Sequence, residues 1–288
     1  MTNTRIMMDD KQFNQLAKII YDRSGIHFPD AKKYILESRL THRLGELEVQ
    51  DFDQYIALLS MGPYQQDEFQ EMFNRITINE TSFFRNDAQL DVFETRILPQ
   101  LLEARSRTKK LRIWSAACST GDEPFTLAIL LHRTLGNRLA DWNIQILGTD
   151  ISEKAINVGV SGIYSSYSVR STPKMVLDRY FKPDGRHYLL NDEIRRMVSF
   201  EKHNLKDRLA AKRHGTWDVI FCRNVLIYFD DPMKKQVMGM FHDQIANDGA
   251  LFIGHSERIV DMDTKFSQIP VPQGFCYAKA GQAGLLAA

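Results

Sequence analysis

The chain has 288 residues, of which 43% are hydrophobic and 25% charged, and its formal net charge is +1. This composition is typical of a soluble globular protein and excludes disordered, collagen-like and membrane-spanning chains. Because no run approaches the about 18 apolar residues of a membrane helix, and the first residues lack a basic segment followed by an apolar one, we expect a cytoplasmic protein.

Residues 1–75 predict a small all-α N-terminal domain. Four helices are expected, over residues 10–24, 30–44, 52–60 and 63–75. Asp30 and Asp51 are suited to cap helix N-termini, and Gly25 and Gly45 lie where a left-handed residue would end a helix. The following segment, ITINETSFFRN at residues 76–86, is too polar for a core and too aromatic for a free linker. We expect it to pack onto the domain that follows.

Residues 76–288 predict an α/β domain, because from Leu111 onward apolar runs of strand length alternate with helical stretches. Helices are expected from Glu123 and from Ser152. The expected strands are LRIWSAA, IQILGTD, WDVIFC and ALFIGHS, with KFSQI and FCYAKA as a closing antiparallel pair. Residues 161–200 interrupt this pattern with a helix near residues 173–181 and a hairpin around residues 187–199. The prediction is a doubly wound, mostly parallel sheet with an inserted β-subdomain.

The loop WSAACSTGDEPFT, residues 114–126, has the order strand, small residues, glycine, acid and helix. The small residues would let a ligand approach the backbone at the carboxyl edge of the first strand; they are Ala116, Ala117, Ser119 and Gly121. Asp122 and Glu123 would repel a phosphate at this helix N-terminus and favour a cationic ligand.

The second strand ends in GTD, which places Asp150 where it can bind ribose hydroxyls. The phosphate-binding patterns GxGxxG and GxxxxGKS/T are absent from the chain. The pattern therefore favours S-adenosylmethionine over a dinucleotide or a nucleoside triphosphate, with a plain structural turn as the alternative.

The three cysteines, Cys118, Cys222 and Cys276, are far apart and form no CxxC pair. An odd, dispersed set argues against a disulfide framework and against a zinc site, so we expect reduced thiols and no metal ion. Cys118 lies in the loop itself, but it has no histidine partner nearby in sequence. We interpret it as a small spacer.

With INETSFFR, WSAACSTGDEPFT, GTD and FCRNVLIYF in this order, the chain resembles the chemotaxis receptor methyltransferases, the CheR family. The resemblance covers nearly the whole chain. It implies a helical N-terminal domain joined to a class I S-adenosylmethionine-dependent methyltransferase domain with an inserted β-subdomain. The implied reaction transfers a methyl group to glutamate side chains of chemoreceptors, giving glutamate 5-O-methyl esters and S-adenosylhomocysteine, for sensory adaptation.

The resemblance also implies roles for residues at matching positions. The implied cofactor contacts are Asn79, Thr81 and Arg85 in the linker, Glu123 for the ammonium, Asp150 for the ribose, Asn204 and Leu205 for the adenosine, and Arg223 and Asn224 completing the pocket. Arg85 and Tyr228 are the implied catalytic residues. Asp122 departs from the family, which commonly has glutamate there; the change keeps the charge and shortens its reach.

Each of these residues also has a plainer interpretation. Arg85 could be a solvated charge, Tyr228 a core aromatic and Asn204 a helix N-cap. His255, in GHSE, is interpreted as a structural residue at a strand end.

Lys32, Arg39 and Arg43 share one side of the predicted helix 30–44. In the family a basic helix of this domain meets the acidic methylation helices of the receptor, so these residues are the expected substrate contacts. An ordinary solvated face is the alternative. The turn in RYFKPDGRHYLLND is short, so we do not expect a tether to a receptor-tail pentapeptide. We expect a monomer.

Two other functions remain as alternatives. A methyltransferase for nucleic acids or protein amines commonly carries Asp/Asn-Pro-Pro-Tyr/Phe where this chain has RNVLIY, and no basic, aromatic-rich stripe is present to bind nucleic acid. A non-catalytic adaptor could bind the cofactor as a sensor, and only turnover would separate it from an enzyme.

Overall fold

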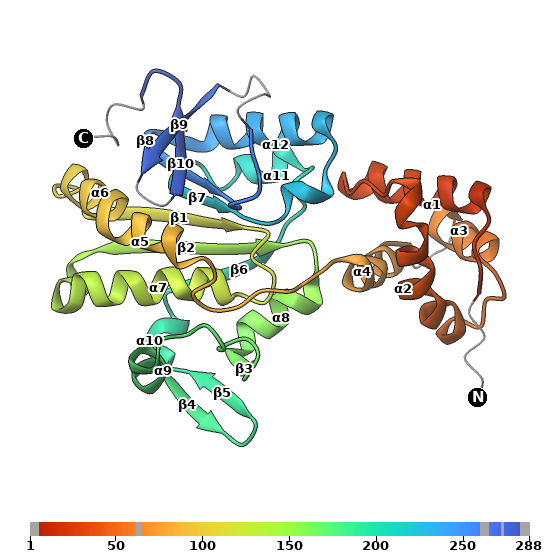
Figure 1. Cartoon of the computed structure of the whole chain (residues 1–288), viewed down its shortest axis with the longest axis horizontal. Helices are drawn as coiled ribbons and strands as arrows, with labels where there is room; N and C mark the ends of the chain where they lie inside the picture. The colour runs from red at the N-terminus through yellow and green to blue at the C-terminus, as the bar shows by residue number, and fades with distance from the viewer. Residues whose placement is uncertain (1–5, 62–64, 260–264, 272–273, 283–288) are drawn as a thin grey trace.

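The N-terminal helices form a bundle beside a larger α/β body in the computed structural model, which describes the chain apart from residues 1–5, 62–64, 260–264, 272–273 and 283–288 (Figure 1). The helices are α1 (Asp10–Ser24), α2 (Lys33–Glu46), α3 (Phe52–Met61) and α4 (Gln65–Ile76). Leu16, Leu40 and Phe52 are fully buried where they meet. The predicted all-α N-terminal domain is confirmed.

The ends of these helices test the cap predictions. Gly25 ends α1 with φ 76°, as predicted, and Asp51 accepts the Gln54 N–H at 2.9 Å at the start of α3. Gly45 does not end α2, which continues to Glu46 because this residue pairs with arginines of α2 and α4. Asp30 caps no helix, since it begins a 3₁₀ turn before α2 starts at Lys33. Pro63, the predicted start of the fourth helix, lies outside the described residues.

A seven-stranded, mostly parallel sheet forms the centre of the second body, in the order β6-β2-β1-β7-β8-β10-β9. Its strands are β1 (Lys110–Ala116), β2 (Asn143–Asp150), β6 (Val198–Lys202), β7 (Trp217–Cys222), β8 (Ile245–Ile253), β9 (Phe266–Val271) and β10 (Gly274–Lys279). β10 pairs antiparallel with both β8 and β9, so the predicted closing pair is confirmed.

Helices cover both faces of this sheet (Figure 1). One face carries α5 (Asp87–Val92), α6 (Leu98–Ala104) and α7 (Asp122–Leu135); the other carries α11 (Arg208–Lys212) and α12 (Asp231–Gln244). Along β7, Val219 and Phe221 enter the first core, whereas Ile220 and Cys222 enter the second, which is the alternation of a strand buried on both faces. The doubly wound α/β prediction is confirmed.

The insert between α8 (Glu153–Ser161) and β6 is a three-stranded antiparallel sheet that projects from the body. It consists of β3 (Ile163–Ser165), α9 (Lys174–Tyr180), β4 (Phe181–Asp184), β5 (His187–Leu190) and α10 (Asp192–Arg195). The helix near residues 173–181 is confirmed, but the hairpin around residues 187–199 is wrong, because β4 pairs with β5 and β6 pairs parallel with β2 of the main sheet.

Three glycines make room for the Phe200 ring of β6 against the main sheet. A Cβ atom on Gly121, Gly148 or Gly159 would come within 2.8 to 2.9 Å of the Phe200 ring. Because these three residues have no side chain, the aromatic ring of Phe200 can pack against them.

Candidate active site

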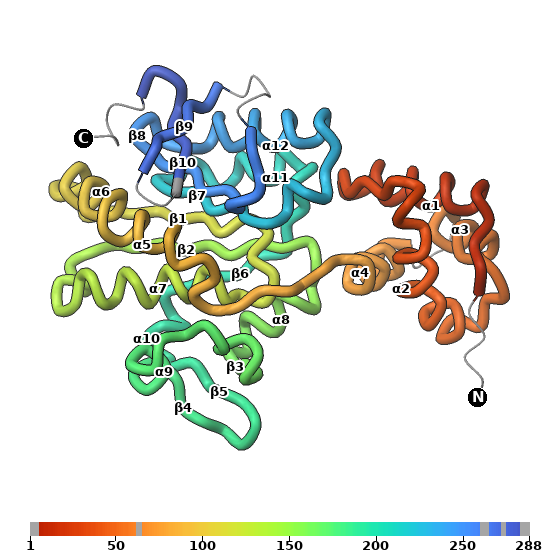
Figure 2. Tube along the Cα trace, viewed as in Figure 1, coloured from red at the N-terminus to blue at the C-terminus, as the bar shows by residue number. Residues whose placement is uncertain are grey.

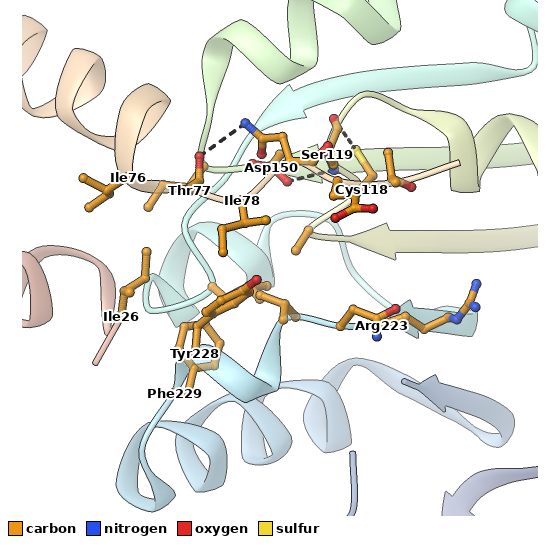
Figure 3. A pocket seen from close by; sticks show the side chains of 18 of the residues that line it. Ile26, Ile76, Thr77, Ile78, Cys118, Ser119, Asp150, Arg223, Tyr228 and Phe229 are labelled. Atoms are coloured by element: carbon orange, nitrogen blue, oxygen red, sulfur yellow. Dashed lines mark hydrogen bonds between the residues drawn. The ribbon is translucent and has the colours of Figure 1, made fainter. Parts of the chain in front are cut away.

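The carboxyl ends of β1, β2 and β7 open into a cavity between the sheet and the N-terminal domain (Figure 3). β1 lies between β2 and β7, so the chain leaves it at the point where the strand order reverses, which is where open α/β sheets bind ligands. The cavity encloses about 1350 Å³, its open mouth included.

The loop after β1 has an unusual backbone. Ala117, Ser119 and Gly121 have φ angles of 60°, 52° and 86°, a left-handed conformation that non-glycine residues adopt at a cost. Ala117 and Ser119 line the cavity, as the prediction of close backbone approach requires. Gly121 does not line it and faces Phe200 instead, so its small size serves packing and not ligand approach.

Asp150, at the end of β2, is held rigidly in the cavity wall. Its carboxylate accepts the Ser119 N–H at 2.8 Å and the Ser152 N–H at 2.9 Å. Burial raises the pKa of this carboxyl, although the two N–H donors oppose the shift. Each oxygen keeps a second acceptor site, which is what a pair of ribose hydroxyls needs.

Glu123, in the first turn of α7, contacts two strands. It accepts the Ser115 hydroxyl of β1 at 2.7 Å and forms an ion pair with Arg223, whose Nη1 lies 3.1 Å from its Oε2. The Arg223 Nη2 donates to the backbone oxygen of Arg85 at 2.7 Å. The pair therefore joins α7, the end of β7 and the linker.

Asp122 turns away from the cavity, which corrects the expectation that both acids of the loop would face a ligand. It is fully buried, its Oδ2 accepts the Thr120 hydroxyl at 2.6 Å, and its Oδ1 has no hydrogen bond within the described residues. Burial raises its pKa to about 6. Glu123 alone supplies the carboxylate at this helix end to the cavity.

The linker, residues 77–86, runs between α4 and α5 (Figure 2), and most of its residues line the cavity. Phe83 is fully buried, edge-on to Tyr164 and Phe181 of the insert, and its N–H donates to the Ser168 oxygen. The expectation that this segment packs onto the second domain is therefore confirmed. Asn79, Thr81 and Arg85 all line the cavity.

Tyr228 lies across the cavity from Asp150 and Ser119, at the wall that also carries Phe229 (Figure 3). Its side chain is half-buried, and its hydroxyl makes no hydrogen bond within the described part of the chain. Partial burial raises the pKa of this phenol above its ordinary value of 10.0. The hydroxyl therefore stays protonated at neutral pH and can donate a hydrogen bond.

Asn204 and Leu205 line the cavity beyond β6, but Asn204 is not a helix cap. Its side-chain amide donates to the Arg23 oxygen at the end of α1, at 2.6 Å, whereas Asp207 caps α11. Lys206 donates to the oxygens of Tyr21 and Asp22, both at 2.8 Å. The segment expected to contact adenosine thus also holds the N-terminal domain.

The N-terminal domain supplies part of the cavity wall, which sequence reasoning missed. Ile26, His27, Phe28 and Ile35 line it. The His27 N–H donates to the backbone oxygen of Tyr228 at 2.8 Å, and Ile26 forms a β-bridge with Phe229. A Cβ on Gly25 would lie 2.5 Å from the Met233 sulfur of α12, so this glycine is also needed for close domain contact. No residue pattern signals such a contact before the two domains are seen together.

The three basic residues of α2 and the preceding turn differ in their surroundings. Lys32 lines the cavity and makes no ion pair within the described residues. Arg39 also lines it, but its guanidinium donates to the oxygens of Ile76 and Thr77 at 2.6 and 3.0 Å. Arg43 does not line the cavity; it pairs with buried Glu68 at 2.5 Å and with Glu46 at 2.9 Å. The charge of Arg43 is therefore compensated inside the domain, whereas Lys32 lies at the cavity.

Other predicted features fall outside the chemistry of the cavity. Cys118 lines it, but burial and nearby carboxylates raise the pKa of its thiol, which fits a spacer. His255 is exposed just beyond β8 and does not line the cavity. Among the described residues there is no group of three or more His, Cys, Asp or Glu side chains suited to a metal ion. The same residues include no helix long and apolar enough to cross a membrane.

The donor set of the cavity fits S-adenosylmethionine. Glu123 and Asp150 offer carboxylates for an ammonium and for ribose hydroxyls, and the buried Arg223 Nε has no hydrogen-bond partner within the described residues. Such an orphaned donor suits the carboxylate of the cofactor's methionine end. Apolar contacts for a purine ring come from Leu205 and Ile151.

Comparison with known proteins agrees with this geometry. Residues 79–275 match the family described as "CheR methyltransferase, SAM binding domain", and residues 11–77 match "CheR methyltransferase, all-alpha domain". Chemotaxis protein methyltransferase 2 of Vibrio cholerae is 34% identical over 263 residues, which cover 91% of this chain and 90% of that protein. The chemotaxis protein methyltransferase of Borreliella burgdorferi is 34% identical over 89% of this chain and 91% of its own. That of Escherichia coli is 34% identical over 91% of this chain and 90% of its own.

Proposed function

The chain belongs to the CheR methyltransferase family, and we propose that it transfers the methyl group of S-adenosylmethionine to glutamate side chains of chemoreceptors in the cytoplasm. Its products would be glutamate 5-O-methyl esters and S-adenosylhomocysteine. The proposal rests on one observation: groups suited to the cofactor and groups suited to an anionic acceptor line the same cavity. Glu123 and Asp150 line it with carboxylates suited to the cofactor, and Arg85 and Tyr228 line it with a guanidinium and a phenol that can receive an anionic acceptor.

A carboxylate acceptor needs no general base, because a side chain with a pKa near about 4.3 is already ionised at neutral pH. When bound, the cofactor supplies an electrophilic methyl group on a sulfonium sulfur. The methyl group would pass to one oxygen of the substrate carboxylate, and the electron pair of the broken methyl–sulfur bond would leave with S-adenosylhomocysteine. Two opposite charges disappear together, so catalysis reduces to alignment in a site shielded from water.

Arg85 and Tyr228 would do the aligning. One Nη of Arg85 donates to the backbone oxygen of Glu80 at 3.0 Å, which anchors the guanidinium and leaves its other N–H groups for a substrate carboxylate. The Tyr228 hydroxyl, which lines the same cavity, could donate to the same carboxylate. Asn79, Thr81, Glu123, Asp150, Asn204, Leu205, Arg223 and Asn224 would hold the cofactor.

The N-terminal domain, residues 1–75, would recognise the receptor, with Lys32 and Arg39 facing an acidic helical region, and residues 76–288 would perform the transfer. The β4–β5 connection supports action without a receptor-tail tether, because only Gly185 and Arg186 lie between the two strands. Such a tight hairpin turn offers no loop to hold a peptide.

The proposal is tested by incubating the protein with cofactor labelled in the methyl group and a panel of acceptors. We expect label in receptor cytoplasmic fragments and none in nucleic acid or in a lysine-rich and arginine-rich protein. Label in the last two alone would favour the amine or nucleic-acid methyltransferase. Cofactor binding without label in any acceptor would favour the sensor.

A further inference from the structure

Glu257 is a buried acid, 4% exposed, just beyond the end of β8. Its carboxylate accepts three backbone N–H groups. Oε2 accepts from Gly254 at 2.6 Å and from Asn224 at 2.9 Å, and Oε1 accepts from Ile227 at 3.3 Å. Glu257 does not line the cavity. It therefore acts on the loops around it and not on a ligand.

Two of these donors lie at the two ends of the loop that follows β7. Asn224 lines the cavity and has φ 60°, so its backbone adopts a left-handed conformation that needs support. Ile227 belongs to the 3₁₀ turn Leu226–Tyr228 (η4), directly before Tyr228. One carboxylate thus fixes the loop from Asn224 to Ile227 at both ends.

Gly254 shows how closely this arrangement is packed. A Cβ atom at this position would lie 2.5 Å from the Glu257 Oε2 and 3.0 Å from the Asn224 nitrogen. The φ angle of Gly254 is not in the left-handed region, so close approach is what requires a glycine here. The loops after β7 and β8 therefore meet at the Glu257 carboxylate.

We propose that Glu257 is a positioning residue for the cofactor and for methyl transfer. By fixing the loop after β7, it holds Arg223 and Asn224 against the cofactor site and sets Tyr228 at the opposite wall. The effect on Tyr228 rests on the proposed function. The effect on cofactor affinity does not depend on what the methyl acceptor is.

Glutamine at this position would have the same shape but could not accept hydrogen bonds on both sides. A carboxylate offers acceptors on both oxygens, whereas a side-chain amide offers one oxygen and an NH₂ group. In Glu257→Gln, that NH₂ would face a backbone N–H, either of Ile227 or of the pair Gly254 and Asn224. One end of the loop would lose its support.

The test measures binding of S-adenosylhomocysteine by calorimetry, then KM for S-adenosylmethionine and kcat on a receptor fragment. For Glu257→Gln we expect about 10- to 100-fold weaker binding of S-adenosylhomocysteine, a matching rise in KM and a lower kcat. Gly254→Ala should act in the same direction, since its methyl group would displace the same carboxylate.

The matched control is Asp218→Asn. Asp218 is a buried acid, 8% exposed, at the opposite end of β7, where it accepts the Arg112 N–H at 2.8 Å and the Arg105 Nε at 2.9 Å. It should lower thermal stability but leave binding and KM near those of the wild type. Glu257→Gln that melts at a lower temperature yet binds S-adenosylhomocysteine as tightly as Asp218→Asn would overturn the proposal. If the wild type binds S-adenosylhomocysteine but methylates no receptor, the proposed function is wrong. The comparison of binding between Glu257→Gln and Asp218→Asn still tests the role of Glu257.

Discussion

Arg223 and Glu123 form a buried ion pair that joins the end of β7 to the first turn of α7, with Nη1 and Oε2 3.1 Å apart. Their side chains are only 4% and 13% exposed. A charge left unpaired in such surroundings is costly.

Glu123→Gln should therefore weaken both folding and cofactor binding. We expect the free energy of unfolding to fall by about 3 kcal/mol, because the Arg223 charge loses its partner in a buried site. Measurement by urea unfolding is direct, since all three tryptophans, Trp114, Trp142 and Trp217, lie in the α/β domain and report on it by fluorescence. The double variant Glu123→Gln/Arg223→Met should recover much of the stability but not the affinity for S-adenosylhomocysteine. Recovery of both would mean that the pair serves folding alone.

Asp122 predicts a pH dependence of stability. Its pKa is raised from 3.8 to about 6 in the folded protein, so between about pH 4 and pH 6 the folded state holds a proton that the unfolded state has lost. Stability contributed by this group therefore falls as pH rises through that window, by about 3 kcal/mol at most. Asp122→Asn should remove the decline and be more stable than the wild type at pH 7. Unfolding curves from pH 4.5 to 7.5 that decline equally in both proteins would rule out Asp122 as the cause.

Tyr228→Phe should separate alignment from binding. The substitution removes the hydroxyl and keeps the ring in the cavity wall. We expect kcat to fall about 10-fold or more, because a hydrogen bond from a neutral donor to the charged substrate carboxylate is lost. The affinity for S-adenosylhomocysteine should stay the same. Arg85→Ala should lower kcat further, because it removes a charged donor. Unchanged turnover in either variant would remove that residue from the mechanism.

Lys32→Glu should weaken receptor recognition without touching the cofactor. Lys32 lines the cavity from the N-terminal domain and forms no ion pair within the described residues. At low salt we expect KM for a receptor fragment to rise about 10-fold, with the difference shrinking as salt screens the charges. Lys18→Glu, at an exposed position of α1 where the lysine forms a surface ion pair with Asp22, makes the same change in net charge and should have little effect. Equal KM values for the two variants would mean that only the net charge of the protein, and not the position of Lys32, affects receptor binding.

Much of the fold and of the cofactor site could be predicted because the signals are local. The strand, loop and helix pattern around Glu123 and the acid at the end of β2 lie within short segments, and the structure brings both into one cavity. The direction of Asp122 could not be predicted, since adjacent residues of a helix turn point to different sides.

The features that could not be predicted from the sequence depend on contacts between residues far apart in the chain. Gly45 looks like a helix end, but Glu46 gains ion pairs with Arg43 and Arg75 by extending the helix. Glu257 looks like any polar residue after a strand until the loop from Asn224 to Ile227 lies against it.

The most direct test of the proposed chemistry is the nature of the bond formed on the receptor. A receptor fragment labelled by the protein with methyl-labelled cofactor should release its label as methanol in mild base, because esters hydrolyse there and methylamines do not. Replacing the accepting glutamates of the fragment by glutamine should abolish the labelling. Label that survives mild base, or persists in the glutamine-substituted fragment, would contradict glutamate methyl-ester formation.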